Sequence, residues 1–215
     1  CRRPDARHVI PWIKREFPDM VVMVATLMDG PKLESYLGKS REGFLSVQEA
    51  VDLGADALVS FMRFRPKTYA KYARDCVMIA GVATQNEALD QLELGADLVK
   101  ATVHTVSGSE FVSKTSVATH NCLPFFVSGG VNHTNLETYI QAGVVVAAAG
   151  FDVLLGKTPP ADAALVPTAQ EAISRMTTLA RVYRKKHQPA LAKAIEDGAS
   201  NLLAHGRWFN TGPAA

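Results

Sequence analysis

Short apolar runs alternate along the chain with segments in which hydrophobic residues recur at helical spacing. At Gly54, Gly95 and Gly143 a helical pattern closes with glycine, and an apolar run follows directly. Glycine suits the left-handed position that ends a helix, and a continuous apolar run suits a strand buried on both faces. The pattern therefore predicts helix–strand units repeated in series.

Helix starts are marked by Ser or Thr followed three residues later by Glu. In such a capping box the two side chains satisfy free backbone amides of the first helical turn. The pairs are Ser46 with Glu49, Thr84 with Glu87, Thr134 with Glu137, and Thr168 with Glu171. Each pair predicts that a helix begins at that point.

Together these signals predict strands at roughly 20–27, 55–61, 77–82, 96–102, 124–128 and 144–149. The predicted helices begin near Pro4, Ser46, Pro66, Thr84, Ser109 and Thr134, and two more span 167–186 and 189–205.

Alternation of strands and helices predicts an α/β fold with a parallel sheet. Short strands rich in small residues, with no Gly-x-Gly-x-x-Gly fingerprint after any of them, favour a (β/α)8 TIM-type barrel over an open doubly wound sheet. Because about six strands are visible, we expect two strands and one helix to be missing before Cys1, through truncation, processing or disorder. Residues 1–156 are expected to form this incomplete barrel, and residues 157–215 a C-terminal helical extension packed on the barrel or on a neighbouring subunit.

The composition argues against nucleic acids, membranes and metal ions as partners. The 215 residues are 47% hydrophobic and carry a formal net charge of +2, so we expect a substantial core and no nucleic-acid partner. With no apolar stretch of membrane-spanning length and no signal peptide, we expect no membrane partner and a cytoplasmic location. The cysteines, Cys1, Cys76 and Cys122, show no metal-like spacing, and we expect core or edge residues and no metal site.

Lys100 stands near the end of a predicted strand that is otherwise built largely of apolar and small residues. Desolvation disfavours an ammonium group, so the pKa of Lys100 is expected to fall and its neutral amine to attack carbonyl carbons. The alternative is a lysine that simply extends its amine to water from the strand end. Strand alternation places Lys100 on the face opposite Val99.

In a parallel barrel, functional groups collect at the carboxyl ends of the strands. The loop that begins with Ser128, Gly129 and Gly130 lies at such an end and is a candidate cradle for a carboxylate or phosphate, or else a plain tight turn. His104 could serve as an acid or base, or be a solvated loop residue. Other groups at strand ends are Thr26 and residues 60–62, 81–84 and 150–151.

The motifs together resemble one family, the class I (Schiff-base) aldolases that cleave 2-keto-3-deoxy-6-phosphogluconate and 4-hydroxy-2-oxoglutarate. The resemblance runs from Arg2 to about Gly156. It is carried by Arg3-Pro4-Asp5-Ala6, Phe17-Pro18-Asp19, Ala25-Thr26, Gly54-Ala55, Val59-Ser60, residues 79–84, residues 94–100 and residues 128–132.

The resemblance implies a homotrimeric barrel without a cofactor, in which Lys100 forms an imine with a 2-keto acid and releases pyruvate plus an aldehyde. Arg2 aligns with the arginine that holds the substrate carboxylate, and Thr26 with a threonine that contacts the carboxylate or the imine region. Ser128, Gly129 and Gly130 match the turn that supports the distal end of the substrate.

Several positions depart from the family pattern. The acid/base glutamate of the family would lie four residues before Arg2, outside this sequence. Residues 101–104 and Phe61 replace proline-containing motifs, and Phe151 replaces a phosphate-binding serine, which disfavours a phosphorylated substrate. The segment 30–43 is expected to be a lengthened loop over the pocket that acts as a lid or a subunit contact.

Two other functions stay open. A phosphate-binding barrel isomerase or synthase would need two acid/base groups and a Gly-rich phosphate site, without a buried lysine. A homologue that keeps the barrel but has lost catalysis would fit the changes at Phe151 and at residues 101–104. The sequence does not specify the substrate, its phosphorylation or the direction of reaction.

Overall fold

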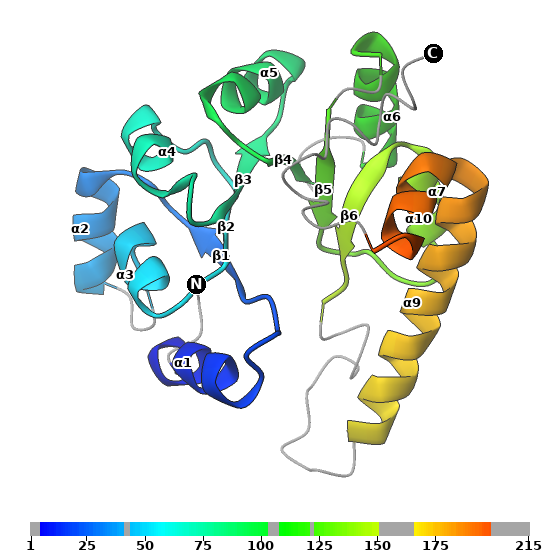
Figure 1. The fold of residues 1–215 in the computed structure, drawn as a ribbon. Helices are drawn as coiled ribbons and strands as arrows, with labels where there is room; N and C mark the ends of the chain where they lie inside the picture. Colours follow the sequence, from blue (N-terminus) through cyan, green and yellow to red (C-terminus); the bar gives the residue numbers. More distant parts are fainter. Residues whose placement is uncertain (1–4, 41–43, 103–107, 121–122, 151–165, 199–215) are drawn as a thin grey trace. The chain divides into compact units, whose positions relative to one another are not determined.

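The computed structural model describes residues 5–40, 44–102, 108–120, 123–150 and 166–198 (Figure 1). The chain forms two compact units, Cys1–Lys100 and Ala101–Ala215. Their boundary falls inside strand β4 (Leu98–Thr102), and each unit is described by itself.

The first unit contains β1, β2, β3 and the first part of β4 in sequence order, so neighbours along the chain are neighbours in the sheet. The pairs β1–β2 and β2–β3 are parallel. Its elements before β4 are α1 (Ala6–Glu16), β1 (Met23–Leu27), α2 (Pro31–Ser40), α3 (Val47–Asp52), β2 (Ala57–Ser60), α4 (Pro66–Tyr72), β3 (Val77–Val82) and α5 (Gln85–Leu94).

The second unit pairs β5 with β6 in parallel and packs helix α9 against α7 and α10. Its elements after β4 are α6 (Ser109–Ala118), β5 (Phe125–Ser128), α7 (Leu136–Gln141), β6 (Val144–Ala148), α9 (Val166–His187) and α10 (Pro189–Glu196).

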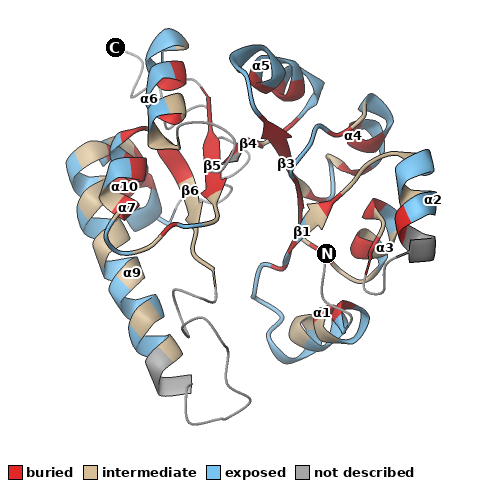
Figure 2. Cartoon of the chain, turned by 180° about the vertical axis from the view of Figure 1, so that it is seen from behind, coloured by how far each residue is buried: buried red, intermediate tan, exposed pale blue. Residues whose placement is uncertain are grey.

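The glycines that were predicted to end helices do so. Gly95 caps α5 in the left-handed conformation, and Gly54 and Gly143 have φ values of 96° and 104°. After Gly54 and Gly95, strands β2 and β4 follow as buried runs, as predicted, and β3 is largely buried too, red in Figure 2. In β6, after Gly143, only Val144 and Val145 are buried, so this strand is covered less completely than predicted.

An aspartate begins each of two strands in the same way. The Asp56 carboxylate accepts a hydrogen bond from the backbone amide of Val22 at 2.7 Å, and the Asp97 carboxylate accepts one from Met78 at 2.7 Å. In return, the amide of each aspartate donates to the carbonyl of the same partner, at 2.9 Å in both cases. The repeated Gly-Ala-Asp sequence therefore fixes the register at the amino ends of neighbouring strands.

Helices α9 and α10 are attached to α7 and β6 by two polar side chains at their junction, the part-buried Arg184 and the buried Gln188. Arg184 donates to the carbonyl of Val145, and Gln188 donates to the carbonyls of Ile140 and Val144 at 2.9 and 2.8 Å. Burial lowers the pKa of Arg184 to about 10. Four basic residues lie in the last turn of α9, namely Arg184, Lys185, Lys186 and His187.

Four local predictions were wrong. Residues 31–40 form helix α2 instead of a loop, because Pro31 suits a first helical position and Glu34 stabilises the first turn by accepting from the amide of Gly30 at 3.3 Å. Helix α7 begins after Asn135, because the Asn132 side chain accepts from both the amide and the hydroxyl of Thr134.

The third wrong prediction concerns Thr168, which lies within α9 and not at its start. Helix α10 ends at Glu196, earlier than predicted, and Gly198 follows with a φ of 67°. By contrast, Thr84 and Glu87 form a complete capping box, and the hydroxyl of Ser46 accepts from the amide of Glu49 at 3.1 Å.

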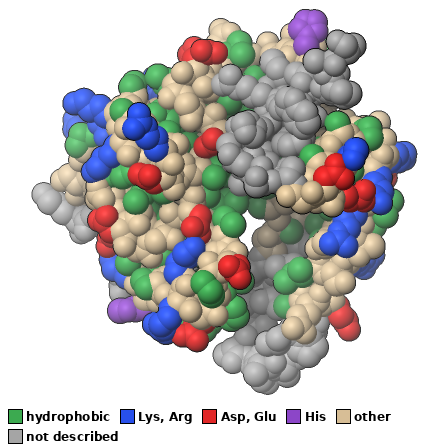
Figure 3. Space-filling view, viewed as in Figure 1, with side chains coloured by type: hydrophobic (Ala, Val, Ile, Leu, Met, Phe, Trp, Pro, Cys, Tyr) green, Lys and Arg blue, Asp and Glu red, His purple; other side chains and the backbone are tan. Residues whose placement is uncertain are grey.

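Basic and acidic side chains lie interspersed on the face shown in Figure 3. Many are paired, as in Lys14 with Asp56 at 2.9 Å and Lys114 with Glu110 at 2.6 Å. Among the helices that the structure describes, none combines the length and hydrophobicity needed to cross a bilayer.

Candidate active site around Lys100

Lys100 lies on β4 and its side chain is 1% exposed. Its neighbours Leu98, Val99 and Ala101 are buried as well, so the amine is shielded from water. This desolvation lowers the pKa of Lys100 from 10.5 to about 8. The expectation of a buried lysine with a depressed pKa is therefore met, and the alternative of a lysine extended into water is not.

The aromatic ring of Phe61 lies directly against this amine. The Lys100 Nζ atom is 3.4 Å from the centroid of the ring. Phe61 follows the end of β2 and is 45% exposed, so the ring separates the amine from water. No sequence pattern paired these two residues, beyond the expectation that both lie near strand ends.

The backbone that carries Phe61 is held on both sides. The buried Ser60 hydroxyl donates to the Leu27 carbonyl at 2.8 Å and accepts from the Met62 amide at 3.0 Å. The Gly81 amide donates to the Met62 carbonyl at 3.1 Å. These bonds connect the segment after β2 to both neighbouring strands, β1 and β3.

Gly81 is required at this place by close packing. A Cβ atom there would lie 2.1 Å from the carbonyl carbon of Phe61 and 2.2 Å from its oxygen. Only glycine lets the backbone at Phe61 pass so close to β3. This approach allows a side chain that follows β2 to reach a lysine on β4.

Thr26 lies near the carboxyl end of β1 in an unusual conformation. Its φ is 60°, which is rare for a β-branched residue, and its hydroxyl donates to the Ala25 carbonyl at 2.6 Å. The register between β1 and β2 shifts between Val24 and Leu27, so β1 has a bulge at this point. Bulges and strained residues occur often beside active sites, where they redirect a side chain.

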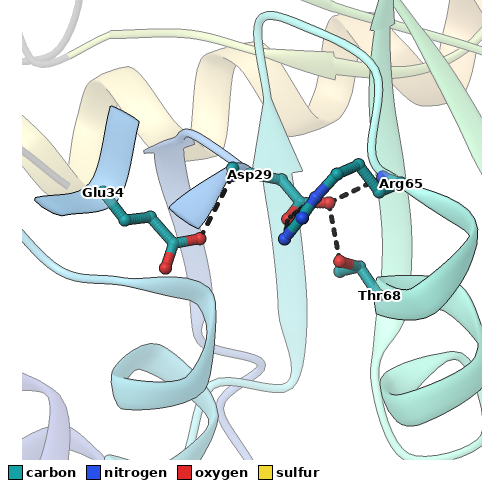
Figure 4. Close-up of polar contacts among 5 residues, drawn as sticks. Asp29, Glu34, Arg65 and Thr68 are labelled. Atoms are coloured by element: carbon teal, nitrogen blue, oxygen red, sulfur yellow. Dashed lines mark hydrogen bonds and ion pairs between the residues drawn. The ribbon is translucent and has the colours of Figure 1, made fainter. Parts of the chain in front are cut away.

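A buried carboxylate connects the loops that follow β1 and β2 (Figure 4). Asp29, whose side chain is 2% exposed, accepts hydrogen bonds from the backbone and guanidinium of Arg65 and from the Thr68 hydroxyl. These bonds are 2.6 to 3.0 Å long. They stabilise the loop around Phe61 from the side opposite β3.

The other predicted site residues lie in the second unit or outside the described residues. Gly129 and Gly130 follow β5 with φ values of 84° and 72°, and Ser128 ends the strand. The side-chain amides of Asn132 and Asn135 both donate to the Gly130 carbonyl, at 3.2 and 2.8 Å, which folds the loop tightly. Helix α7 has six residues, so its dipole adds little to an anion site here.

Arg2, His104 and Phe151 lie outside the described residues. The structure thus places Lys100 and Thr26 in one unit and the loop from Ser128 to Gly130 in the other. Among the residues that the structure describes, no group of three or more His, Cys, Asp or Glu could hold a metal ion.

Comparisons with known proteins gave matches among solved structures. No family model matches the sequence, and no curated protein matches it. A structure described as "Native KDPGal structure" matches with a TM-score of 0.62 at 21% identity, covering 85% of this chain and 79% of that chain. KDPG aldolase from Legionella pneumophila, with pyruvate captured at low pH as a covalent carbinolamine intermediate, gives 0.58 at 18% identity, covering 83% and 76%. The fold is similar to that of KDPG aldolase.

This chain is also similar in structure to a second enzyme. Thiamine phosphate pyrophosphorylase from Pyrococcus furiosus matches with a TM-score of 0.52 at 15% identity, covering 81% of this chain and 90% of that chain. At these identities the likeness shows the fold alone. With six parallel-type strands in the described residues, the fold is that of a partial TIM-type barrel, and the resemblance seen in the sequence holds at the level of the fold.

Proposed function

We propose that this protein is a class I aldolase in which Lys100 forms an imine with a 2-keto acid. The observation that carries the proposal is a buried lysine with a pKa of about 8, at the middle of strand β4. A lysine with such a pKa is partly neutral near pH 7 and can act as a nucleophile. The covalent carbinolamine of pyruvate described for KDPG aldolase supports the same chemistry on this fold.

The proposed reaction begins when the lone pair of the Lys100 Nζ atom attacks C2 of the keto acid. The carbonyl oxygen takes up a proton to give a carbinolamine, and loss of water gives a protonated imine. A base then removes the proton of the C4 hydroxyl, the C3–C4 bond breaks, and its electron pair moves into the C2–C3 bond. An aldehyde leaves, the enamine is protonated at C3, and water releases pyruvate and the free amine.

The remaining roles belong to this proposal. We assign Thr26 and Arg2 to the keto-acid carboxylate, and Ser128, Gly129 and Gly130 to the distal end of the substrate. The imine itself accepts the electron pair, so the reaction needs no cofactor. A homotrimer in the cytoplasm, acting on a small 2-keto acid, completes the proposal.

Trapping with borohydride tests the proposal. The full chain is incubated with pyruvate and borohydride, digested and examined by mass spectrometry, with Lys100→Met as the matched variant. We expect a reduced pyruvyl adduct on Lys100 in the wild type and none in the variant. No adduct at Lys100 on folded protein would contradict the proposal and favour a homologue without catalytic activity.

A further inference from the structure

We propose that Phe61 is a gate over Lys100, whose ring must rotate away before any carbonyl compound can reach the amine. The inference starts from the 3.4 Å between the Lys100 Nζ atom and the centroid of the Phe61 ring. The role of this gate in catalysis rests on the proposed function. The blocked access to the amine does not depend on which carbonyl compound is the substrate.

The ring occupies space that a reacting carbon needs. A carbonyl carbon must come within about 3 to 3.5 Å of the nitrogen in line with its lone pair. The ring already lies at that distance, and the lysine side chain is only 1% exposed. On its other side the ring is exposed to solvent, so the open position lies toward water.

The movement is confined to the side chain. Ser60 and Gly81 hold the backbone on either side of Phe61, and Gly81 packs against its carbonyl group. Rotation about the side-chain torsions leaves these contacts intact. Aromatic side chains at exposed positions change rotamer rapidly, so opening can keep pace with turnover.

The closed ring has two opposite effects on the amine. It excludes water, which disfavours the ammonium form, and its π face attracts a cation, which favours that form. Exclusion of water dominates here, since desolvation is the cause of the lowered pKa of Lys100. Phe61 thus raises the fraction of the amine that is neutral and controls access to it.

Reductive methylation with formaldehyde and cyanoborohydride tests the gate without the aldolase reaction. The rate of labelling at Lys100 is followed by peptide mass spectrometry across pH 6 to 11 in wild type, Phe61→Leu and Phe61→Ala, with the exposed Lys114 as internal standard. For Phe61→Ala we expect the plateau rate at high pH to rise about tenfold, equivalent to ~1.4 kcal/mol, and the midpoint to move upward. Phe61→Leu, which keeps an apolar cover, should stay closer to wild type in midpoint.

Phe17→Ala is the matched control, because Phe17 is similarly exposed, at 48%, and packs edge-to-face against Trp12 in the region of α1. It should leave labelling of Lys100 unchanged. Equal plateau rates and midpoints in wild type and Phe61→Ala would overturn the gate. Should Phe61→Ala not fold, Phe61→Trp replaces it, and labelling as fast as in wild type would then overturn the gate.

Pyruvate trapping on the same variants separates this inference from the proposed function. If formaldehyde labelling follows the expected pattern but pyruvate leaves no adduct in any variant, the gate stands and the aldolase proposal fails. If pyruvate is trapped at one rate in all variants, the aldolase proposal stands and the gate is overturned.

Discussion

In the first unit, the amino ends of the strands are regularly hydrogen-bonded, whereas the carboxyl ends hold a strained backbone and a buried amine. At the amino ends, Asp56 and Asp97 make the same reciprocal bonds to the preceding strand. At the carboxyl ends, Thr26 has a left-handed backbone, β1 is bulged and Lys100 is buried beneath Phe61. One end therefore stabilises the sheet, whereas the other holds strain and a desolvated amine, features that often cluster at functional sites.

The largest effect is expected from Gly81→Ala, which tests how tightly the carboxyl ends are packed. The added Cβ would lie 2.1 Å from backbone atoms of Phe61 that cannot move aside cheaply. We expect the free energy of unfolding to fall by about 3 kcal/mol or more, measured by urea denaturation. Gly30→Ala, where the nearest atom lies at 4.0 Å, is the control and should change stability little. An equal loss in both variants would contradict this packing account.

Lys100→Met should stabilise the protein, because it removes a buried amine. The pKa of Lys100 is about 8 in the folded protein and 10.5 in the unfolded chain, so the unfolded chain binds the proton more tightly. The free energy of unfolding therefore rises with pH from 8 toward 10.5. Below pH 8 the protein carries the full cost of burying the protonated amine. We expect a gain of about 3 kcal/mol at pH 7 that shrinks across this window.

The control for this substitution is Lys114→Met, at a side chain that is 75% exposed. Its effect should stay below about 0.5 kcal/mol at any pH. If Lys100→Met destabilised the protein at pH 7, the amine would not be desolvated as described.

At the amino ends, Asp97→Ala should remove the acceptor for the Met78 amide. We expect a loss of about 2 kcal/mol in the free energy of unfolding, with labelling of Lys100 unchanged. Asp97→Asn keeps an acceptor oxygen and should lose less. Because burial raises the pKa of Asp97, the wild type is stabilised by this group below its unfolded pKa and loses that contribution as the pH rises, and Asp97→Asn should lack this dependence.

Thr26→Gly should give the smallest change, with the opposite sign. Glycine adopts a φ of 60° without strain, so we expect a gain of about 1 kcal/mol in thermal or urea unfolding. Imine trapping should slow, because the hydroxyl proposed to bind the substrate is lost. Ala25→Gly, at an ordinary φ, should instead lose about 0.5 to 1 kcal/mol. A loss at Thr26 equal to that at Ala25 would show that its backbone holds no strain.

Local signals predicted most of the fold. The sequence predicted the strand at 77–82 and the helix-ending glycines Gly54, Gly95 and Gly143. A glycine that follows a helical pattern and precedes an apolar run is typical of a helix end followed by a strand. Helix α2 was missed because residues 30–43 were interpreted as a lengthened loop over the pocket, although Pro31 and Glu34 were signals of a helix start.

The site was predictable only in part. The burial of Lys100 followed from its apolar strand, but the contact with Phe61 joins residues two strands apart. That contact depends on Gly81 letting the backbone approach, and no local pattern reports such an approach. The conformation of Thr26 likewise comes from the bulge in β1, which the register with β2 creates.

The central claim, that burial turns Lys100 into a nucleophile, is tested most directly by an NMR titration of the full chain with carbon-labelled lysine. The Lys100→Met variant assigns the resonance. We expect one lysine to titrate near pH 8, well below the ordinary value of 10.5. A Lys100 resonance that titrates with the surface lysines near 10.5 would contradict the account.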